Sequence, residues 1–229
     1  MKKTIVIISS LLFSYFQLSG QVYEPVTVSA GTPVLKYFPL EERYRYPDFK
    51  DGQINYKNGS VSKGRFNYNF LKGDIDFIQL NDTLSLVTRR EMSFLTIGSD
   101  TFYFDNGYIE QISGGNLIVG VKQFVKLKDV LKKGAFGTTN RHSAIESYKP
   151  VTRGGFQDWI PNEDCVFQME REYYFSNNGN IFVLFTRKKT LEMFPWHKDK
   201  IQGYLKSNKI NFSSEDDLLR LAEYLRSLS

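Results

Sequence analysis

The chain has 229 residues, of which 41% are hydrophobic and 15% aromatic, and its formal net charge is +5. This length allows one large or two small domains with a buried core. So small a positive charge argues against nucleic acid as a partner. Cys165 is the single cysteine, which excludes an intrachain disulfide. Its neighbours Val166 and Phe167 indicate a buried thiol without a catalytic role.

The first twenty residues have the pattern of a secretory signal peptide. Lys2 and Lys3 precede a mostly apolar run over 5–16, and Gly20 is the small residue before a cleavage site. The apolar run is shorter than the about 20 residues that span a bilayer. Residues 1–20 are therefore expected to be removed. This takes away two lysines and no acid, so 28 basic and 25 acidic residues remain, a net charge of +3.

The residue after the cleavage site indicates whether the chain receives a lipid anchor. A lipoprotein signal requires a cysteine there, whose thiol takes the lipid, and this chain has Gln21 instead. We therefore expect an exported protein, periplasmic or on the cell surface, that carries neither a lipid nor a transmembrane anchor after cleavage.

Residues 21–50 are predicted to form an extended or irregular arm. They contain four of the seven prolines, and proline disfavours helix because it lacks an amide donor. Tyrosine and phenylalanine side chains are interleaved with these prolines, and we expect them to hold the arm against the surface of a domain. The prolines are Pro25, Pro33, Pro39 and Pro47.

Residues 51–229 are predicted to form one β-rich domain. Aromatic residues favour strands, and runs such as Thr101-Phe102-Tyr103-Phe104 alternate in the way of a half-buried strand. The dipeptides Asn58-Gly59, Asn106-Gly107 and Gly114-Gly115 each mark a hairpin turn. The strands expected from these patterns are 53–57, 61–71, 76–80, 84–89, 92–97, 101–104, 108–112, 117–127, 166–175 and 181–187.

Near the C-terminus, the spacing of apolar residues changes from that of a strand to that of a helix. Apolar residues recur on one helical face after Ser213 or Ser214, either of which is a suitable cap; they are Leu218, Leu221, Ala222, Leu225 and Leu228. Residues 197–207 are expected to form a second helix. Arg226 lies off the apolar face, so its side chain is predicted to be dispensable. The fold class expected is mainly β (α+β): an antiparallel meander sheet, as a sandwich or open half-barrel, with one or two C-terminal helices packed on it.

No motif in the sequence specifies a reaction. His142 and His197 are the only histidines and no cysteine pair exists, so we expect no metal site, no cofactor and no catalytic residue. Asp74 and Asp76 stand two apart, which would place both on one face of a strand. Carboxylates are ordinarily exposed, so both are predicted to be solvated.

A long, weakly patterned segment over 134–164 contains the candidate contact surface, residues 138–160. Loops of this length are often functional. The segment carries four residues of types that recur in recognition sites, namely Arg141, His142, Arg153 and Trp159. They are candidate ligand- or partner-binding residues. The alternative is that Trp159 and Ile160 pack into the core before Pro161.

Lysines gather at two further places. Lys122, Lys126 and Lys128 would share one face of the expected strand 117–127 and its extension, and 187–189 with Lys198 and Lys200 forms a second basic cluster. Either cluster is a candidate contact to anionic lipid headgroups or acidic glycans. The alternative for the first cluster is the solvated side of a sheet.

Three segments carry a resemblance to known proteins. They are the Asn58-Gly59 hairpin with Phe66-Asn67-Tyr68-Asn69, the stretch 132–137, and the ending from Met193-Phe194-Pro195 to the last helix. In this layout, most of residues 52–228 resembles a broad set of uncharacterised exported β-rich proteins of Gram-negative bacteria. The resemblance implies a cell-envelope location and no particular activity or site residue.

These observations favour a non-enzymatic binding or assembly protein of the periplasm or cell surface, whose partner is an envelope protein or glycan. Two alternatives stay open. One is a hydrolase that acts on envelope glycans or peptides, and the other is a carrier whose curved sheet holds a lipid.

The signal-peptide pattern gives a direct prediction. Mass spectrometry of the protein from its native cells should find an unlipidated N-terminus near Gln21, because the basic, apolar and small-residue regions end there. Recovery of a chain that still begins at Met1, or of a lipid adduct, would contradict this expectation.

Overall fold

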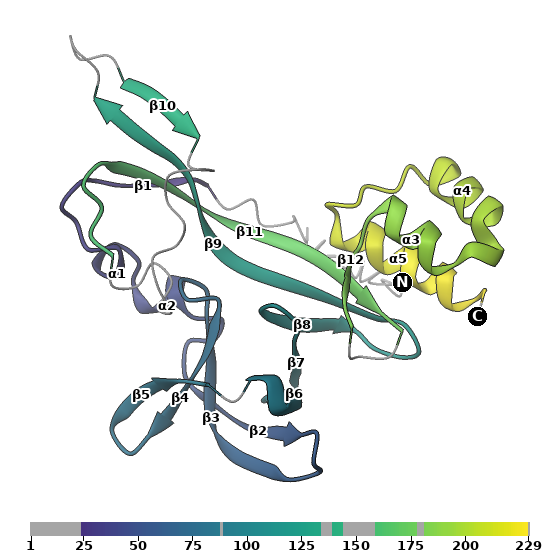
Figure 1. Cartoon of the computed structure of the whole chain (residues 1–229), viewed down its shortest axis with the longest axis horizontal. Coiled ribbons are helices and arrows are strands. Elements are labelled where there is room, and N and C mark those ends of the chain that lie inside the picture. The colour runs from purple at the N-terminus through teal and green to yellow at the C-terminus, as the bar shows by residue number, and fades with distance from the viewer. Residues whose placement is uncertain (1–23, 88, 134–138, 144–158, 178–180, 229) are drawn as a thin grey trace, which may run out of the picture.

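The computed structural model describes residues 24–87, 89–133, 139–143, 159–177 and 181–228. These residues form one antiparallel sheet of twelve strands and a group of helices at the C-terminal end (Figure 1). The sheet follows a meander and is not closed. The predicted fold class is therefore confirmed.

The strands are β1 (Val26–Val28), β2 (Lys50–Tyr56), β3 (Val61–Asn69), β4 (Asp74–Gln79), β5 (Asp82–Ser85), β6 (Met92–Ile97), β7 (Asp100–Phe104), β8 (Tyr108–Ser113), β9 (Ile118–Lys133), β10 (Thr139–Ser143), β11 (Asp164–Ser176) and β12 (Val183–Leu184). The helices are α1 (Val34–Tyr37), α2 (Leu40–Arg43), α3 (Arg187–Met193), α4 (Lys198–Ser207) and α5 (Glu215–Arg226), with 3-10 turns η1 (Arg89–Glu91) and η3 (Pro195–His197).

The meander curls back on itself. Its strand order is β1-β11-β9-β8-β7-β6-β2-β3-β4-β5, so four strands separate β3 from β9. Even so, the hydroxyl of Tyr68 donates to the carbonyl of Gln123 (2.7 Å), and the amide of Val125 donates to the carbonyl of Phe70 (3.0 Å). These two hydrogen bonds bring the end of β3 against the middle of β9, and the side chains enclosed by the curl form the first hydrophobic core.

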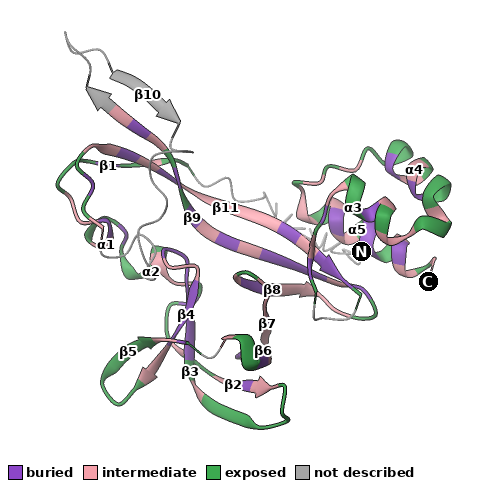
Figure 2. Cartoon of the chain, viewed as in Figure 1, coloured by how far each residue is buried: buried purple, intermediate pink, exposed green. Residues whose placement is uncertain are grey.

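The two longest strands, β9 and β11, form a ribbon that runs through the whole molecule. β11 pairs with β9 along its entire length, from Asp164 opposite Leu131 to Ser176 opposite Ile118. One half of the ribbon contributes to the first core, and the half that contains Val119 and Phe175 contributes to a second core beneath the helices. Figure 2 shows buried residues along both strands and on the inward sides of the helices.

The helical cap, residues 187–228, covers the second core. Of the five residues predicted for the apolar face of the last helix, Leu218, Leu221, Ala222 and Leu225 of α5 are each 0% exposed. The fifth, Leu228, lies just beyond the end of α5 and is partly buried against the same core. Ser214 caps α5 by accepting a hydrogen bond from the amide of Asp217. No helix within the described residues has the length and apolar character needed to cross a membrane.

The prediction of a strand over 181–187 is wrong for most of that range. The strand observed there, β12, comprises only Val183–Leu184, and α3 begins at Arg187. The reason is local: the side chain of Thr186 accepts a hydrogen bond from the amide of Lys189, which starts a helix. The helical cap therefore contains three helices instead of one or two.

The strand predicted over 84–89 begins earlier and ends at Ser85. β4 and β5 are joined by the two residues Leu80 and Asn81, because Gln79 pairs with Asp82. Leu80 accommodates this tight turn with a φ of 56°, in the left-handed region, and its side chain is 92% exposed. Such a conformation is uncommon for leucine, which explains why the sequence pattern predicts a longer connection.

The arm over 21–50 is less extended than predicted. β1 pairs with the outer edge of β11, but α1 and α2 are single helical turns that follow Pro33 and Pro39. A proline fixes φ near the helical value and the first amides of a helix need no partner, so proline can precede a helix that it could not interrupt. Two of the aromatic residues expected to hold the arm against the domain, Phe38 and Tyr46, are buried in the first core, whereas Tyr37 is 42% exposed.

The side chain of Arg226 also differs from its prediction. It donates to the carbonyl of Leu117 (2.7 Å) and to the hydroxyl of Ser113 (2.7 Å), so it joins α5 to the turn between β8 and β9. The sequence identifies the apolar face of the helix but not this contact, because Leu117 is 109 residues away.

These packing differences predict a ranking of stabilities. Leu225→Ala should lower the free energy of unfolding by about 2–5 kcal/mol, because it leaves a cavity in the second core. Arg226→Ala should lower it by about 1–3 kcal/mol through lost charged hydrogen bonds. Glu223→Ala, at an exposed position of the same helix, is the control and should stay within about 0.5 kcal/mol of wild type. Urea denaturation measures all three, and equal values for Leu225→Ala and Glu223→Ala would mean that α5 does not stabilise the core.

Candidate functional site

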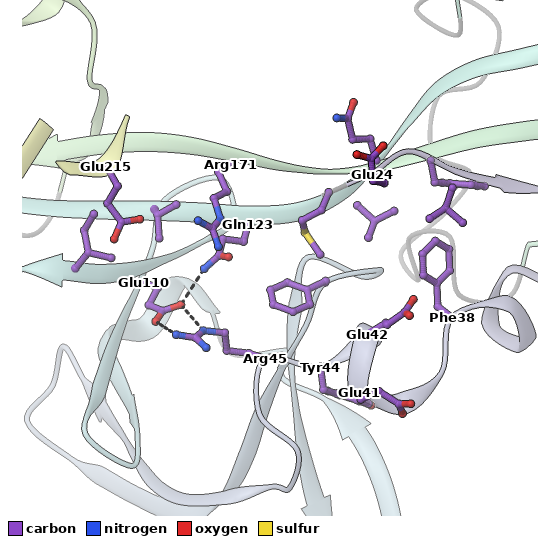
Figure 3. Close-up of a pocket in the computed structure, with 18 residues that line it drawn as sticks. Glu24, Phe38, Glu41, Glu42, Tyr44, Arg45, Glu110, Gln123, Arg171 and Glu215 are labelled. Carbon is purple, nitrogen blue, oxygen red and sulfur yellow. Dashed lines mark hydrogen bonds and ion pairs between the residues drawn. The ribbon is translucent and has the colours of Figure 1, made fainter. Parts of the chain in front are cut away.

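A cleft of about 760 Å3 lies where the two cores meet along the ribbon (Figure 3). We call it the glutamate cleft. The β9–β11 ribbon forms one wall, with Val121, Gln123 and Val125 of β9 and Met169 and Arg171 of β11. The arm, β8 and the start of α5 supply the remaining walls.

The side chain of Asn67 and a backbone hydrogen bond fix the part of the arm that forms the wall opposite the ribbon. Asn67 of β3 is 1% exposed; its amide donates to the carbonyl of Tyr46 (2.8 Å) and its oxygen accepts from the amide of Tyr46 (3.2 Å). The amide of Arg45 donates to the carbonyl of Tyr68 (2.9 Å). The arm thus follows the edge of β3 as an irregular extra strand, which brings Tyr44 and Arg45 to the cleft.

A charged hydrogen-bonded group stands at one end of the glutamate cleft. Arg45 donates from Nε and Nη2 to the two carboxylate oxygens of Glu110, each at 3.0 Å, and Gln123 Nε2 donates to the same carboxylate at 3.3 Å. Glu110 is 7% exposed and Gln123 is 8% exposed. A buried carboxylate requires such partners, because an unpaired charge in the interior is strongly unfavourable. The group is therefore held in one geometry.

Carboxylates outnumber cations along the glutamate cleft. Figure 3 shows Glu110 and Glu215 toward one end and Glu24, Glu41 and Glu42 toward the other. With Arg45 and Arg171 as the two guanidinium groups, the lining has a formal charge of three negative. Apolar residues make up much of the rest of the lining, among them Phe38, Phe70, Val125, Phe167 and Met169. The cleft is thus negative and amphipathic.

The carboxylates of the cleft do not converge on a point. Within the described part of the chain, no three His, Cys, Asp or Glu side chains are arranged to hold a metal ion. The charge is therefore distributed along the cleft, which suits a ligand with separated positive groups better than a single ion.

Behind the cleft wall, Asp76 is completely buried, so the prediction that it is solvated is wrong. Its carboxylate accepts from the hydroxyl of Tyr44 (2.9 Å), from Lys72 Nζ (2.9 Å) and from the hydroxyl of Ser85 (2.8 Å). The amide of Asn69 adds a fourth partner at 3.1 Å. These partners replace water around the charge. Asp76 thereby fixes Tyr44, whose ring lines the cleft.

Asp74 is also buried rather than solvated. Its carboxylate is ion-paired with Arg89, at the start of η1, and also accepts from the amide of Ile75. Burial raises the pKa of Asp74 to about 6, and the attraction of Arg89 opposes that effect only in part. Asp74 and Asp76 therefore differ in partners although they lie on the same strand.

The four candidate residues of the long loop fall in different places. Arg141 and His142 lie on β10, which pairs with the end of β9, and their side chains are outside the described structure. Arg153 lies outside the described residues. Trp159 is half-buried against the first core; its ring contacts that of Phe167 (centroids 6.1 Å apart), and its carbonyl accepts from the amide of Val34. Ile160 is 53% exposed, so the expectation that it packs into the core is wrong.

The three lysines of the predicted basic face lie on the side of the ribbon away from the first core. Lys126 Nζ and Lys128 Nζ both contact the carboxylate of Glu170, at 3.2 and 2.6 Å. Lys122 donates to the carbonyl of Asp105 (2.9 Å) and lies over the ring of Tyr174. Since Glu170 neutralises part of this charge, the face is less basic than the sequence alone indicates.

Cys165 has the buried thiol that its neighbours predict. It is 1% exposed, and burial, together with the nearby charges of Glu163 and Asp164, raises its pKa to about 11. The thiolate needed for nucleophilic chemistry is therefore scarce at neutral pH.

The sequence analysis missed the glutamate cleft, although one local signal marks it. Val119, Val121, Val125 and Leu127 alternate on one face of β9, and Gln123 interrupts them; Arg171 lies opposite Gln123 in β11. A polar pair inside an apolar alternation indicates a place where the face is not covered by core. No such signal identifies Glu41 or Glu215, which approach the cleft only through the fold.

No protein-family model, curated protein or solved structure matches this chain. Inference about its role therefore starts from the geometry of its own residues.

The raised pKa of Asp74 predicts a specific pH dependence. Because the folded-state pKa of about 6 exceeds the ordinary aspartate pKa of 3.8, the folded state binds more protons than the unfolded state between those pH values. The contribution of Asp74 to stability should fall as pH rises from about 4 to about 6 and stay constant above that. The difference in unfolding free energy between wild type and Asp74→Asn, from urea denaturation at several pH values, should follow this curve.

Asp51→Asn, at an exposed position, is the control and should run parallel to wild type over the same range. A difference between wild type and Asp74→Asn that does not change with pH would show that Asp74 has an ordinary pKa.

Proposed function

We propose that this chain is an exported, non-enzymatic binding protein of the cell envelope, and that its ligand occupies the glutamate cleft. Export is inferred from the signal-peptide pattern of residues 1–20. The observation that carries the binding role is the cleft, whose volume of about 760 Å3 is typical of ligand pockets.

The lining of the cleft supports a ligand class. Its formal charge of three negative favours a basic ligand, and the apolar residues of its lining favour one with apolar parts. Glu41 and Glu42 are exposed on α2, so their charge is available to a ligand at the cleft entrance. A basic peptide segment of an envelope protein, with lysine or arginine beside apolar residues, meets these requirements.

The same lining disfavours the two alternatives. A glycan hydrolase uses a protonated acid and a second carboxylate that flank one bond. Glu110 is the buried carboxylate among the described cleft residues, and both of its oxygens already accept hydrogen bonds from Arg45, so it is not placed to give a proton to a leaving group. A lipid carrier requires an apolar cavity, whereas carboxylates stand toward both ends of this one.

Binding of a defined peptide tests the proposal. A peptide of alternating lysine and leucine should bind the mature chain more tightly than a matched peptide of serine and leucine, and its affinity should fall with added salt. Glu41→Gln/Glu42→Gln should weaken lysine-peptide binding by roughly 2- to 30-fold, since each exposed ion pair contributes about 0.2–1 kcal/mol. Isothermal titration calorimetry measures these affinities.

A matched control is Glu91→Gln/Glu223→Gln, which removes the same charge at exposed positions outside the cleft. It should bind as wild type does. Equal affinity for both peptides, or equal losses in the two double variants, would contradict the proposal. Cleavage of the peptide, detected by mass spectrometry, would favour the hydrolase alternative instead.

A further inference from the structure

We propose that the helical cap is a contact surface for anionic lipid headgroups, separate from the glutamate cleft and independent of the function proposed for it. The observations concern the segment 187–209, which we call the basic segment. It comprises α3, η3 and α4 at the end of the molecule away from β10 (Figure 1).

Positive charge is concentrated in the basic segment. Its seven basic residues are Arg187, Lys188, Lys189, Lys198, Lys200, Lys206 and Lys209, and its two acidic residues are Glu192 and Asp199. The rest of the chain after residue 20 carries 21 basic and 23 acidic residues. The basic segment thus accounts for more than the whole positive charge of the chain without its signal, and an anionic surface would attract this end of the molecule first.

An exposed tryptophan stands within this charge. Trp196, in η3, is 92% exposed, although tryptophan is ordinarily among the more buried residues. Lys198 and Lys200 follow it directly at the start of α4, and both are exposed. Tryptophan prefers the interface between water and acyl chains, and lysine the layer of anionic headgroups just outside it. The neighbourhood of Trp196 therefore matches the two layers of a bilayer surface.

The helical cap also contains a shallow cavity of suitable character. It has a volume of about 510 Å3 and is lined by Arg187 and Lys206 with the apolar residues Leu205 and Phe212. Asp199 is the acidic residue of its lining, so the charge there is positive. Two cations beside apolar side chains fit a phosphate headgroup and the glycerol end of its acyl chains.

The helices that carry these residues are held in fixed positions. The rings of Tyr204 in α4 and Tyr224 in α5 stack with centroids 3.9 Å apart and planes 8° apart. The hydroxyl of Tyr224 also donates to the carbonyl of Lys200 (3.3 Å). α4 is thereby fixed to α5, whose apolar face is in the second core. The backbone of α4 would therefore lose little conformational entropy on docking, which favours binding.

Vesicle binding by the mature chain tests the inference. The chain should bind vesicles of phosphatidylcholine with phosphatidylglycerol and not vesicles of phosphatidylcholine alone. Lys198→Gln/Lys200→Gln should weaken this binding about 30-fold, because each lysine near an anionic surface contributes about fivefold. Lys36→Gln/Lys63→Gln removes the same charge at exposed positions outside the cap and should change the affinity little.

Fluorescence separates lipid contact from simple charge attraction. Of the two tryptophans, Trp159 is half-buried against Phe167, so a blue shift on vesicle binding should come from Trp196. Trp159→Phe should keep the shift and Trp196→Phe should lose it. Equal binding to both kinds of vesicle, or equal losses in the two lysine variants, would overturn the inference. So would vesicle binding that gives no blue shift and is displaced by dextran sulfate, an outcome that would indicate an acidic glycan as the partner.

Discussion

The β9–β11 ribbon is the constraint that organises this molecule. Two paired strands of 16 and 13 residues are far too long for one small core to cover, and a two-stranded ribbon is at best marginally stable alone. Its apolar face is covered from two directions: the curled meander packs on one half and the helical cap on the other. The two hydrophobic cores follow directly from this division.

The glutamate cleft lies where the two coverings meet. Gln123 and Arg171 interrupt the apolar face of the ribbon there, so neither core extends across it. Charged groups can occupy this place only with partners, and Arg45 supplies them for Glu110. Asp76 extends the same solution behind the wall, since its four side-chain partners satisfy a fully buried carboxylate and hold Tyr44 in place. Polar groups in these positions contribute less to stability than apolar ones would, which is consistent with a binding role.

Charge is divided between two parts of the molecule. The glutamate cleft is negative, whereas the basic segment of the helical cap is strongly positive. The small net charge of the whole chain conceals this division, because opposite charges cancel in a sum but not across a surface. The proposed basic ligand and the proposed lipid surface would therefore be attracted to different parts of the molecule. Neither would compete with the other for the same residues.

Local patterns in the sequence determined much of the fold. The strand alternation, the glycine turns and the apolar face of α5 depend on residues a few positions apart, and β6 and the buried side of α5 lie where these patterns predict. Arg226 and the paired lysines of the ribbon depend on partners far along the chain, so their contacts could not be inferred. Asp74 and Asp76 likewise look solvent-exposed in sequence, because burial of a carboxylate depends on side chains such as Arg89 and Tyr44 that only folding brings to them. The cleft is the clearest case: Gln123 marks one of its walls in the sequence, but its lining also comes from the arm, β8 and α5, and only folding brings segments this far apart together.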